Sequence, residues 1–346
     1  MVATKPLSEP KTLQEAISYF ADPDRAFEYA KKLRWPDGNV ICPRCGAAKN
    51  SFIKTRKLWF CYACKKQFTI KVKTIFEDSP LGLDKWMTAF WMLANCKNGV
   101  SSHELGRTLG ITQTSAWFML QRIREVLGNK KAGSRKIGGE GNEVEIDETF
   151  VGGKLKNMHR EKQARYRALT STGYGAGVTG KSVVMGMLDR SARQIRATVV
   201  PDVSRLTLQN AVLSNVEHGT NVYTDQASAY QRLSRTYIHE IVNHAETYVR
   251  GRVHTNGLEN FWSLFKRNLS GTYVCVEPFH LERYVDEQVF RYNNRGSKES
   301  PMKDADRFAL AMSQVYGHRL TYSELTGKNE SPRHEETGAG TASEPF

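Results

Sequence analysis

Three acidic residues stand where the sequence could build a metal-dependent catalytic site. Asp147 lies in a strand of alternating polarity (residues 144–150), and Asp225 ends an apolar strand at the position where α/β sheets commonly carry functional groups. Glu259 lies near the start of an amphipathic helix. Two divalent cations about 4 Å apart need hard oxygen ligands from several elements, and such a pair drives in-line attack on a phosphodiester. Any one of these residues alone would be interpreted as a surface charge or a helix cap, so the prediction depends on the three together.

Other polar residues near these three could be mistaken for ligands. Alternation places Glu145 on the same strand face as Asp147 and Glu148 on the opposite face, so Glu145 is the alternative ligand. Asn256 precedes Glu259 by three residues. We interpret Asn256 as the cap of that helix, with a role as a partner of Glu259 as the alternative.

Four cysteines have the spacing of a metal site. Cys42 and Cys45 form one Cys-x-x-Cys pair, and Cys61 and Cys64 form a second pair after a gap of 15 residues. In a reducing compartment this spacing indicates a metal site rather than disulfides. Four thiolates close a tetrahedron and leave no open position for a substrate, so we expect one structural Zn²⁺.

Two basic segments indicate contact with phosphates. Residues 38–75 contain nine Lys and Arg and no Asp or Glu, whereas ordinary surfaces mix both signs. Residues 154–167 contain six basic residues and one acidic residue, and we interpret them as a mobile loop that orders on DNA, with an insertion without a role as the alternative. The DNA contacts expected from the two segments are Lys54, Arg56, Lys57, Lys65, Lys66, Lys154, Lys156 and Arg160.

Residues 101–127 fit a helix-turn-helix. Ser102 is expected to cap a short helix, Gly110 to make the turn and Thr112 to cap the second helix. Short polar side chains in the first turn of that second helix can reach base edges in a major groove. These side chains are Gln113, Thr114 and Ser115. Many helical hairpins share this pattern without binding DNA, which is the alternative.

The composition agrees with a partner that is a polyanion. The 346 residues are 40% hydrophobic and 25% charged, and this length and composition exclude a fully disordered chain and a mini-protein. The formal net charge of +14 indicates a polyanionic partner. No apolar run reaches the roughly 18 residues that cross a bilayer, and the N-terminus lacks the pattern of a signal peptide. We therefore expect a cytoplasmic protein with no membrane partner.

The elements that must position these residues form several units. After a helical and zinc-binding N-terminal region, strands followed by alternating helices indicate an α/β domain with one central sheet. The expected units are an N-terminal helical segment (1–37), a zinc ribbon (38–75), a helix-turn-helix (82–128), a Gly-rich linker (129–142), a catalytic domain (143–296) and a C-terminal extension (297–346) that is disordered from about residue 328.

Taken in order, these motifs resemble a known family. The segments 146–149, 223–226 and 254–267 are similar to those of the DDE transposases of bacterial insertion sequences. The zinc ribbon, which opens at residues 33–38, and the helix-turn-helix resemble the insertion-sequence family numbered fifteen-ninety-five. The resemblance runs from about Leu13 to Arg295 and implies a ribonuclease H-like catalytic fold.

The resemblance implies an enzyme that binds the terminal inverted repeats of its element and performs DNA cleavage and strand transfer. It implies that Asp147, Asp225 and Glu259 hold two Mg²⁺ ions, or Mn²⁺, although some relatives carry Asn in place of this Glu. It also implies that Lys266 contacts DNA beside the reacting phosphate, with a solvated helix lysine as the alternative. The implied partners are double-stranded DNA of the element ends and target, bound by a homodimer or higher oligomer at the bacterial nucleoid.

Two other functions remain open from the sequence. A DNA-binding regulator derived from a transposase would keep the fold without catalysis. A structure-selective nuclease of the same fold would cleave DNA without joining it.

Overall fold

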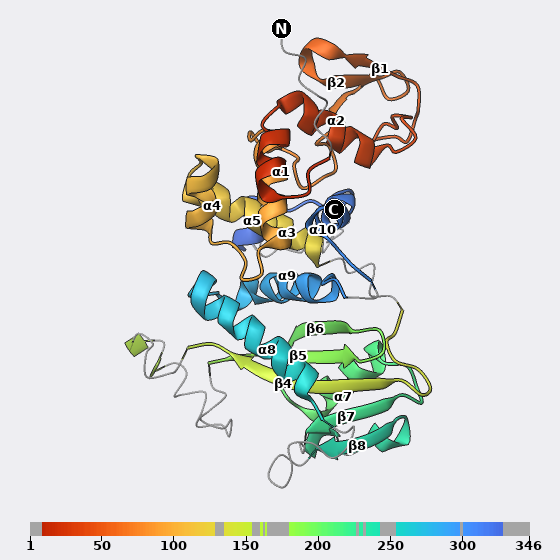
Figure 1. The fold of residues 1–346 in the computed structure, drawn as a ribbon, viewed down its shortest axis with the longest axis vertical. Helices are drawn as coiled ribbons and strands as arrows, with labels where there is room; N and C mark the ends of the chain where they lie inside the picture. Colours follow the sequence, from red (N-terminus) through yellow and green to blue (C-terminus); the bar gives the residue numbers. More distant parts are fainter. Residues whose placement is uncertain are drawn as a thin grey trace, which may run out of the picture.

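The computed structural model describes residues 9–128, 135–153, 160–161, 163–164, 180–225, 228–230, 233–242, 254–297 and 300–327. Two parts follow one another along the long axis of the molecule (Figure 1). One contains helices and a small three-stranded sheet, and the other is built on a five-stranded sheet. Among the described residues, no helix is both long and apolar enough to cross a membrane.

The first part begins with two capped helices and a small antiparallel sheet. Thr12 and Asp22 cap the helices by accepting bonds from backbone N–H groups in their first turns. Trp59 stacks between Phe27 and Phe68 at centroid distances of 5.7 Å, which ties the sheet to the second helix. The elements are α1 (Leu13–Phe20), α2 (Pro23–Arg34), β1 (Asn50–Ile53), η1 (Lys54–Arg56), β2 (Leu58–Cys61) and β3 (Gln67–Thr69), and the strand order is β1-β2-β3.

The helix-turn-helix pattern corresponds to α4 (Ser102–Leu109) and α5 (Gln113–Leu127), which follow α3 (Leu83–Asn95). Two local predictions are confirmed: Thr112 caps α5, and Gly110 ends α4 in the left-handed conformation. The prediction that Ser102 caps α4 is wrong by one residue. Ser101 has the extended backbone of a cap and accepts the Glu104 N–H at 3.1 Å.

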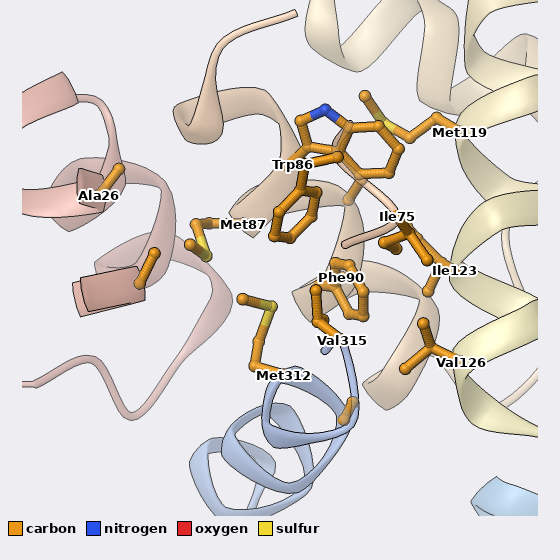
Figure 2. Close-up of a cluster of buried hydrophobic side chains, with 14 of the residues drawn as sticks. Ala26, Ile75, Trp86, Met87, Phe90, Met119, Ile123, Val126, Met312 and Val315 are labelled. Atoms are coloured by element: carbon orange, nitrogen blue, oxygen red, sulfur yellow. The ribbon is translucent and has the colours of Figure 1, made fainter. Parts of the chain in front are cut away.

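One hydrophobic core joins these elements, as Figure 2 shows. Trp86 and Phe90 of α3 are buried beside Ile123 of α5 and Val315. Val315 follows α10 (Asp304–Ser313), which returns to this core. Helix α11 (Tyr322–Thr326) packs on α5 through Tyr322 and Phe118. The segment expected as a C-terminal extension therefore completes the N-terminal core as far as Val315, while 328–346 lies outside the described residues.

The second part is a mixed sheet covered on both faces. Its strands run in the order β6-β5-β4-β7-β8, with β4, β5 and β6 antiparallel and β4, β7 and β8 parallel. Helix α7 packs on one face, and α8 and α9 pack on the other. The elements are β4 (Glu143–Val151), β5 (Ser182–Asp189), β6 (Gln194–Val200), α7 (Arg205–Asn215), β7 (Asn221–Asp225), η4 (Ser228–Tyr230), η5 (Leu233–Arg235), β8 (Ile238–Val242), α8 (Asn256–Asn268), η6 (Leu269–Tyr273), η7 (Pro278–His280) and α9 (Leu281–Asn293).

This strand order is that of a ribonuclease H-like domain, so the predicted fold class is confirmed: a zinc-ribbon and helical region, then an α/β domain. The C-terminal half of the linker expected at 129–142 is attached to this domain. Ile137 forms a bridge with Val216, and the Gly138 N–H donates to Asp189 at 3.0 Å. Residues 129–134 lie outside the described residues.

A buried ion cluster joins the two parts of the molecule. Glu287 of α9 is completely buried, and its carboxylate accepts from Arg124 Nε of α5 at 2.6 Å and from Arg291. The hydroxyl of Tyr273, the last residue of the π-helical turn η6 that follows α8, donates to the same carboxylate. Burial alone would raise the pKa of Glu287, but Arg291 and Arg124 hold it below its ordinary value. The cluster therefore fixes α5 against the helices of the second part.

We expect Glu287→Ala to lower the free energy of unfolding by about 3–5 kcal/mol, because it leaves two arginines buried without their counter-charge. Glu125→Ala is the matched control. Its ion pair with Arg283, 3.0 Å long, is partly exposed, and its loss should cost about 1 kcal/mol or less. Urea denaturation followed by tryptophan fluorescence measures both variants. Equal losses would contradict the role given to Glu287.

Candidate active site and zinc site

The three predicted carboxylates converge where β4, β7 and α8 meet. In the parallel register of β4 and β7, Glu145 stands opposite Tyr223, and Asp147 and Asp225 each lie two residues further along. Glu259 is in the first turn of α8, which packs on β4 and β5. Burial, followed by the charges of Asp225 and Glu259, raises the pKa of Asp147 to about 6. Asp147 therefore lies within electrostatic reach of both other carboxylates.

This acidic site is open rather than closed. The Glu259 side chain is exposed and Asp147 is half-buried. Within the described ranges, the group of potential ligands whose donor atoms all lie within 4.8 Å of one another is the cysteine set, not the acidic set. The acidic residues therefore lie near one another, but their carboxylate oxygens are farther apart than the ligand atoms around a single bound ion.

Helix α8 holds Asp147 through a tryptophan. Trp262 donates from Nε1 to Asp147 Oδ2 at 3.0 Å, and the Glu148 N–H donates to Oδ1 at 2.9 Å. The indole can come this close because Gly186 pairs with Asp147 across the sheet. A Cβ atom on Gly186 would lie 2.6 Å from the indole ring. A glycine inside an apolar strand is the sequence signal for such a close approach.

Glu145 shares the face of Asp147, as alternation predicts, but it supports α8 instead of offering a free ligand. Its side chain is fully buried, and Oε2 accepts the Leu258 N–H in the first turn of α8 at 3.0 Å. Its Oε1 pairs with Arg190 Nε at 2.7 Å. Gly257 permits this contact, because a Cβ atom there would lie 2.9 Å from Glu145 Oε2.

The prediction that Asn256 caps α8 is wrong. The N-cap residue is Thr255, and its side chain makes no cap bond. The carboxylate of Glu145, which comes from the neighbouring strand, satisfies an N–H of the first turn and places negative charge at the positive end of the helix. A cap supplied by a residue more than 100 positions away has no local pattern in the sequence.

Glu148 is a candidate functional residue, although strand alternation places it on the face opposite Asp147. Burial, followed by the charges of Asp147 and Asp225, raises its pKa to about 8. Its Oε1 atom is buried, without a hydrogen-bond partner in the part of the chain that the structure describes. Alternation indicates only which face a side chain leaves from. The pairing of β4 with β7 places Glu148 near Asp225, and the acidic pair Asp147-Glu148 is the signal that could have found it.

The predicted DNA contacts lie on several elements. Lys266 is exposed in the last turn of α8, seven residues after Glu259. On the zinc ribbon Lys57 is half-buried and pairs with Asp24, so it is already partly neutralised. Lys154 and Lys156 lie outside the described residues. The remaining basic candidates are exposed, and they are Lys54, Arg56, Lys65, Lys66 and Arg160.

The first turn of α5 is partly engaged within the protein. Gln113 is exposed, and its Nε2 donates to Ser102 Oγ of α4 at 2.8 Å. Ser115 bonds to the cap residue Thr112 through both its hydroxyl and its N–H. Thr114 is exposed. Two of the three predicted base-reading side chains thus also stabilise the turn.

The four predicted zinc ligands come together. Their Sγ atoms all lie within 4.8 Å of one another, with 3.9 Å between those of Cys42 and Cys64 and 3.6 Å between those of Cys45 and Cys61. Cys61 ends β2, so the small sheet positions one of the Cys-x-x-Cys pairs. Four clustered thiols are the donor set of a structural zinc site.

Comparisons with known proteins agree with this organisation. The ISXO2-like transposase domain matches residues 138–293, and the transposase zinc-ribbon domain matches residues 22–67. An uncharacterized protein in transposable element ISH50 of Halobacterium salinarum is 26% identical over 260 residues, covering 73% of this chain and 85% of that protein. A chain of the simian T-cell lymphotropic virus intasome in complex with PP2A regulatory subunit B56 gamma is 11% identical, with 62% of this chain and 72% of that chain covered. Its TM-score of 0.28 is too low to relate the two folds.

The domain matches place the five-stranded sheet, the acidic residues beside α8 and the cysteine cluster in a protein of the transposase class. With both of its domains matched, the chain belongs to the IS1595 transposases, and the predicted family is confirmed.

We expect Cys61→Ser to reduce bound zinc from about one ion per chain to none and to unfold the ribbon, because four thiolates are needed to close the tetrahedron. Cys96→Ser, outside the cluster, is the control and should keep the metal. Elemental analysis of purified protein measures both. A ribbon that stays folded in zinc-free wild-type protein would contradict a structural metal.

The raised pKa of Glu148 predicts how stability without divalent ions depends on pH. The unfolded chain releases this proton near pH 4.5, whereas the folded chain keeps it until about pH 8. Stability therefore falls as pH rises between these values. Over that window we expect Glu148→Gln to remove a fall in melting temperature of roughly 10 °C, because each unit of pKa difference corresponds to about 1.4 kcal/mol. Glu140→Gln, an exposed position, should melt like the wild type, and a wild-type curve with the opposite slope would contradict the assignment.

Proposed function

We propose that this chain is an active transposase that binds the terminal inverted repeats of its insertion sequence and catalyses metal-dependent DNA cleavage and strand transfer. The observation that carries the proposal is the gathering of Asp147, Asp225 and Glu259. Burial and two like charges keep the pKa of Asp147 near 6. Carboxylates held together against their mutual repulsion favour binding of a cation.

The donor set fits two Mg²⁺ ions, or Mn²⁺, because all three side chains offer hard oxygens. Bound ions supply Lewis acidity to the phosphate and stabilise the attacking and leaving oxygens of an in-line displacement. Asp147, Asp225 and Glu259 are the proposed ligands. Trp262 orients Asp147, and Glu145 holds the start of the helix that carries Glu259.

The proposed reaction has two displacements at the same site. Water first attacks the phosphodiester at the end of the element, and the freed 3′-hydroxyl then attacks target DNA. Lys266 contacts a phosphate beside the reacting one, on the same helix as Glu259. Two ends must meet one target, which calls for at least a homodimer on DNA.

The DNA-binding surface of the proposal joins the zinc ribbon to the first turn of α5 and the end of α8. Lysines and arginines neutralise phosphates, and Lys57 does so after release from its ion pair with Asp24. Thr114, together with Gln113 and Ser115 after exchange of their internal bonds, faces base edges. The proposed phosphate contacts are Lys54, Arg56, Lys57, Lys65, Lys66, Lys154, Lys156 and Arg160.

Asp147→Asn should reduce cleavage and strand transfer by about 10³-fold or more, a loss of roughly 4 kcal/mol of transition-state stabilisation, because it removes one ligand charge. Affinity for DNA should stay within about twofold. The assay uses purified protein, Mg²⁺ and duplexes that carry the inverted repeats flanking the gene. Glu240→Gln, exposed on β8 of the same sheet, is the control and should retain activity.

The outcomes of this assay separate the alternatives. Wild-type activity in Asp147→Asn would mean that the assigned site is wrong. Wild-type protein that binds the ends but does not cleave them with Mg²⁺ or Mn²⁺ would indicate a regulator. Cleavage without joining would indicate a nuclease.

A further inference from the structure

A cavity of about 510 Å³ lies between the helix-turn-helix and the turn that ends α8. One stripe of α5 lines it, made of Gln113, Trp117, Leu120 and Arg124 at helical spacing. The other walls are the start of α4, residues 272–275 and part of α9. The cavity therefore borders α5, the helix proposed to read bases, on one side and the turn that follows α8 on the other.

The floor of the cavity is aromatic and electrically balanced. The guanidinium carbon of Arg124 lies 4.0 Å from the ring centroid of Tyr284 and 4.9 Å from that of Tyr273, and all three residues line the cavity. The charge of Arg124 is matched by Glu287 at 2.6 Å, so the floor has less attraction for a phosphate than a free arginine would. Its Nη1 has no hydrogen-bond partner in the described part of the chain. The aromatic floor therefore suits stacking of a flat neutral ring, while the hydrogen-bonding groups for the edge of that ring lie on the rim.

The rim of the cavity is polar and in one place strained. His103 and Gln113 are exposed there, and Ser102 is half-buried. Val274 is 80% exposed with a φ of 61° and a ψ of −56°, and β-branched residues rarely adopt a positive φ. Strained residues of this kind cluster at binding and catalytic sites. The half-buried Trp117 forms part of the wall below this rim.

We propose that the cavity accepts one unstacked nucleobase of the DNA substrate. Proteins hold extruded bases by stacking against aromatic side chains and by hydrogen bonds to the base edge, and this cavity offers both. The occupant comes from DNA rather than from a free metabolite, because the mouth lies between the first turn of α5 and the segment that follows Lys266. The inference rests on the proposed function, which places both of these elements on DNA.

Capture of a base gives the protein a way to open the duplex between its recognition site and its catalytic site. Unpairing and unstacking cost a few kcal/mol, and the cost is smaller where the base is already mismatched. The position that enters the cavity should therefore be the one at which a mismatch improves binding.

Mismatch scanning along the element-end duplex, measured by fluorescence anisotropy, tests this expectation. For the wild type, a mismatch at one position should tighten binding about 5- to 10-fold. Trp117→Ala should abolish the gain and Trp117→Phe should restore it. Phe118→Ala is the matched control on the same helix, since Phe118 packs against Tyr322 outside the cavity and should retain the gain.

A second measurement uses the wild-type chain and so does not depend on how the variants fold. Cys275 is exposed and lines the cavity. A duplex with a mixed disulfide tethered to the base at the scanned position should exchange with the Cys275 thiol, forming the crosslink and releasing the small thiol. The same group tethered at other positions should not react. Cys275→Ser should lose the crosslink, and Cys96→Ser should retain it.

The outcomes distinguish the inference from the function on which it rests. Failure of the wild type to bind any matched end would overturn the proposed function and the base site together. Binding with no mismatch gain at any position, a gain that survives Trp117→Ala, or no position-specific crosslink would overturn the base site alone.

Discussion

One buried carboxylate, that of Glu287, sets the relative positions of the two parts of the molecule. It accepts hydrogen bonds from Arg124 of α5, from Arg291 of its own helix and from Tyr273 at the end of the turn after α8. Removing one partner would leave charge buried without compensation, which costs several kcal/mol. The cluster therefore connects α5, the helix proposed to read DNA, with α9 and with the turn that follows the helix carrying Glu259.

Helix α8, which carries Glu259, is supported along its whole length. Glu145 accepts an N–H of its first turn, Trp262 bonds to Asp147 from its middle, and Tyr273 anchors the turn that follows it. The glycines at positions 186 and 257 make room for these contacts. Such support is needed because the acidic residues are partly buried and close to one another. Burial, followed by the charges of the neighbouring carboxylates, raises the pKa values of Asp147 and Glu148. The rigid surroundings hold the carboxylates near one another despite their mutual repulsion.

The sequence alone was sufficient for the features whose physical cause is local. Two Cys-x-x-Cys pairs specify a tetrahedral metal site wherever the chain lets them meet, and they do meet. Strand alternation and helical periodicity predicted an α/β domain, and the order of the motifs predicted its family. The caps at Thr112 and Gly110 also follow from neighbouring residues. Each cap is decided by residues within about one helical turn, and each Cys-x-x-Cys pair by a motif of four residues.

Only the tertiary structure decided the features that depend on distant partners. Glu145 replaced Asn256 as the support of α8, and Glu148 joined the acidic site through the neighbouring strand. Arg124 and Glu287 are 163 residues apart, and helix α10 returns to complete the N-terminal core. A sequence pattern records which face of an element is apolar, but not which element will cover it. Burial then determines which charges must pair and which must repel, so the pKa values and the geometry of the site arise only when the chain is folded.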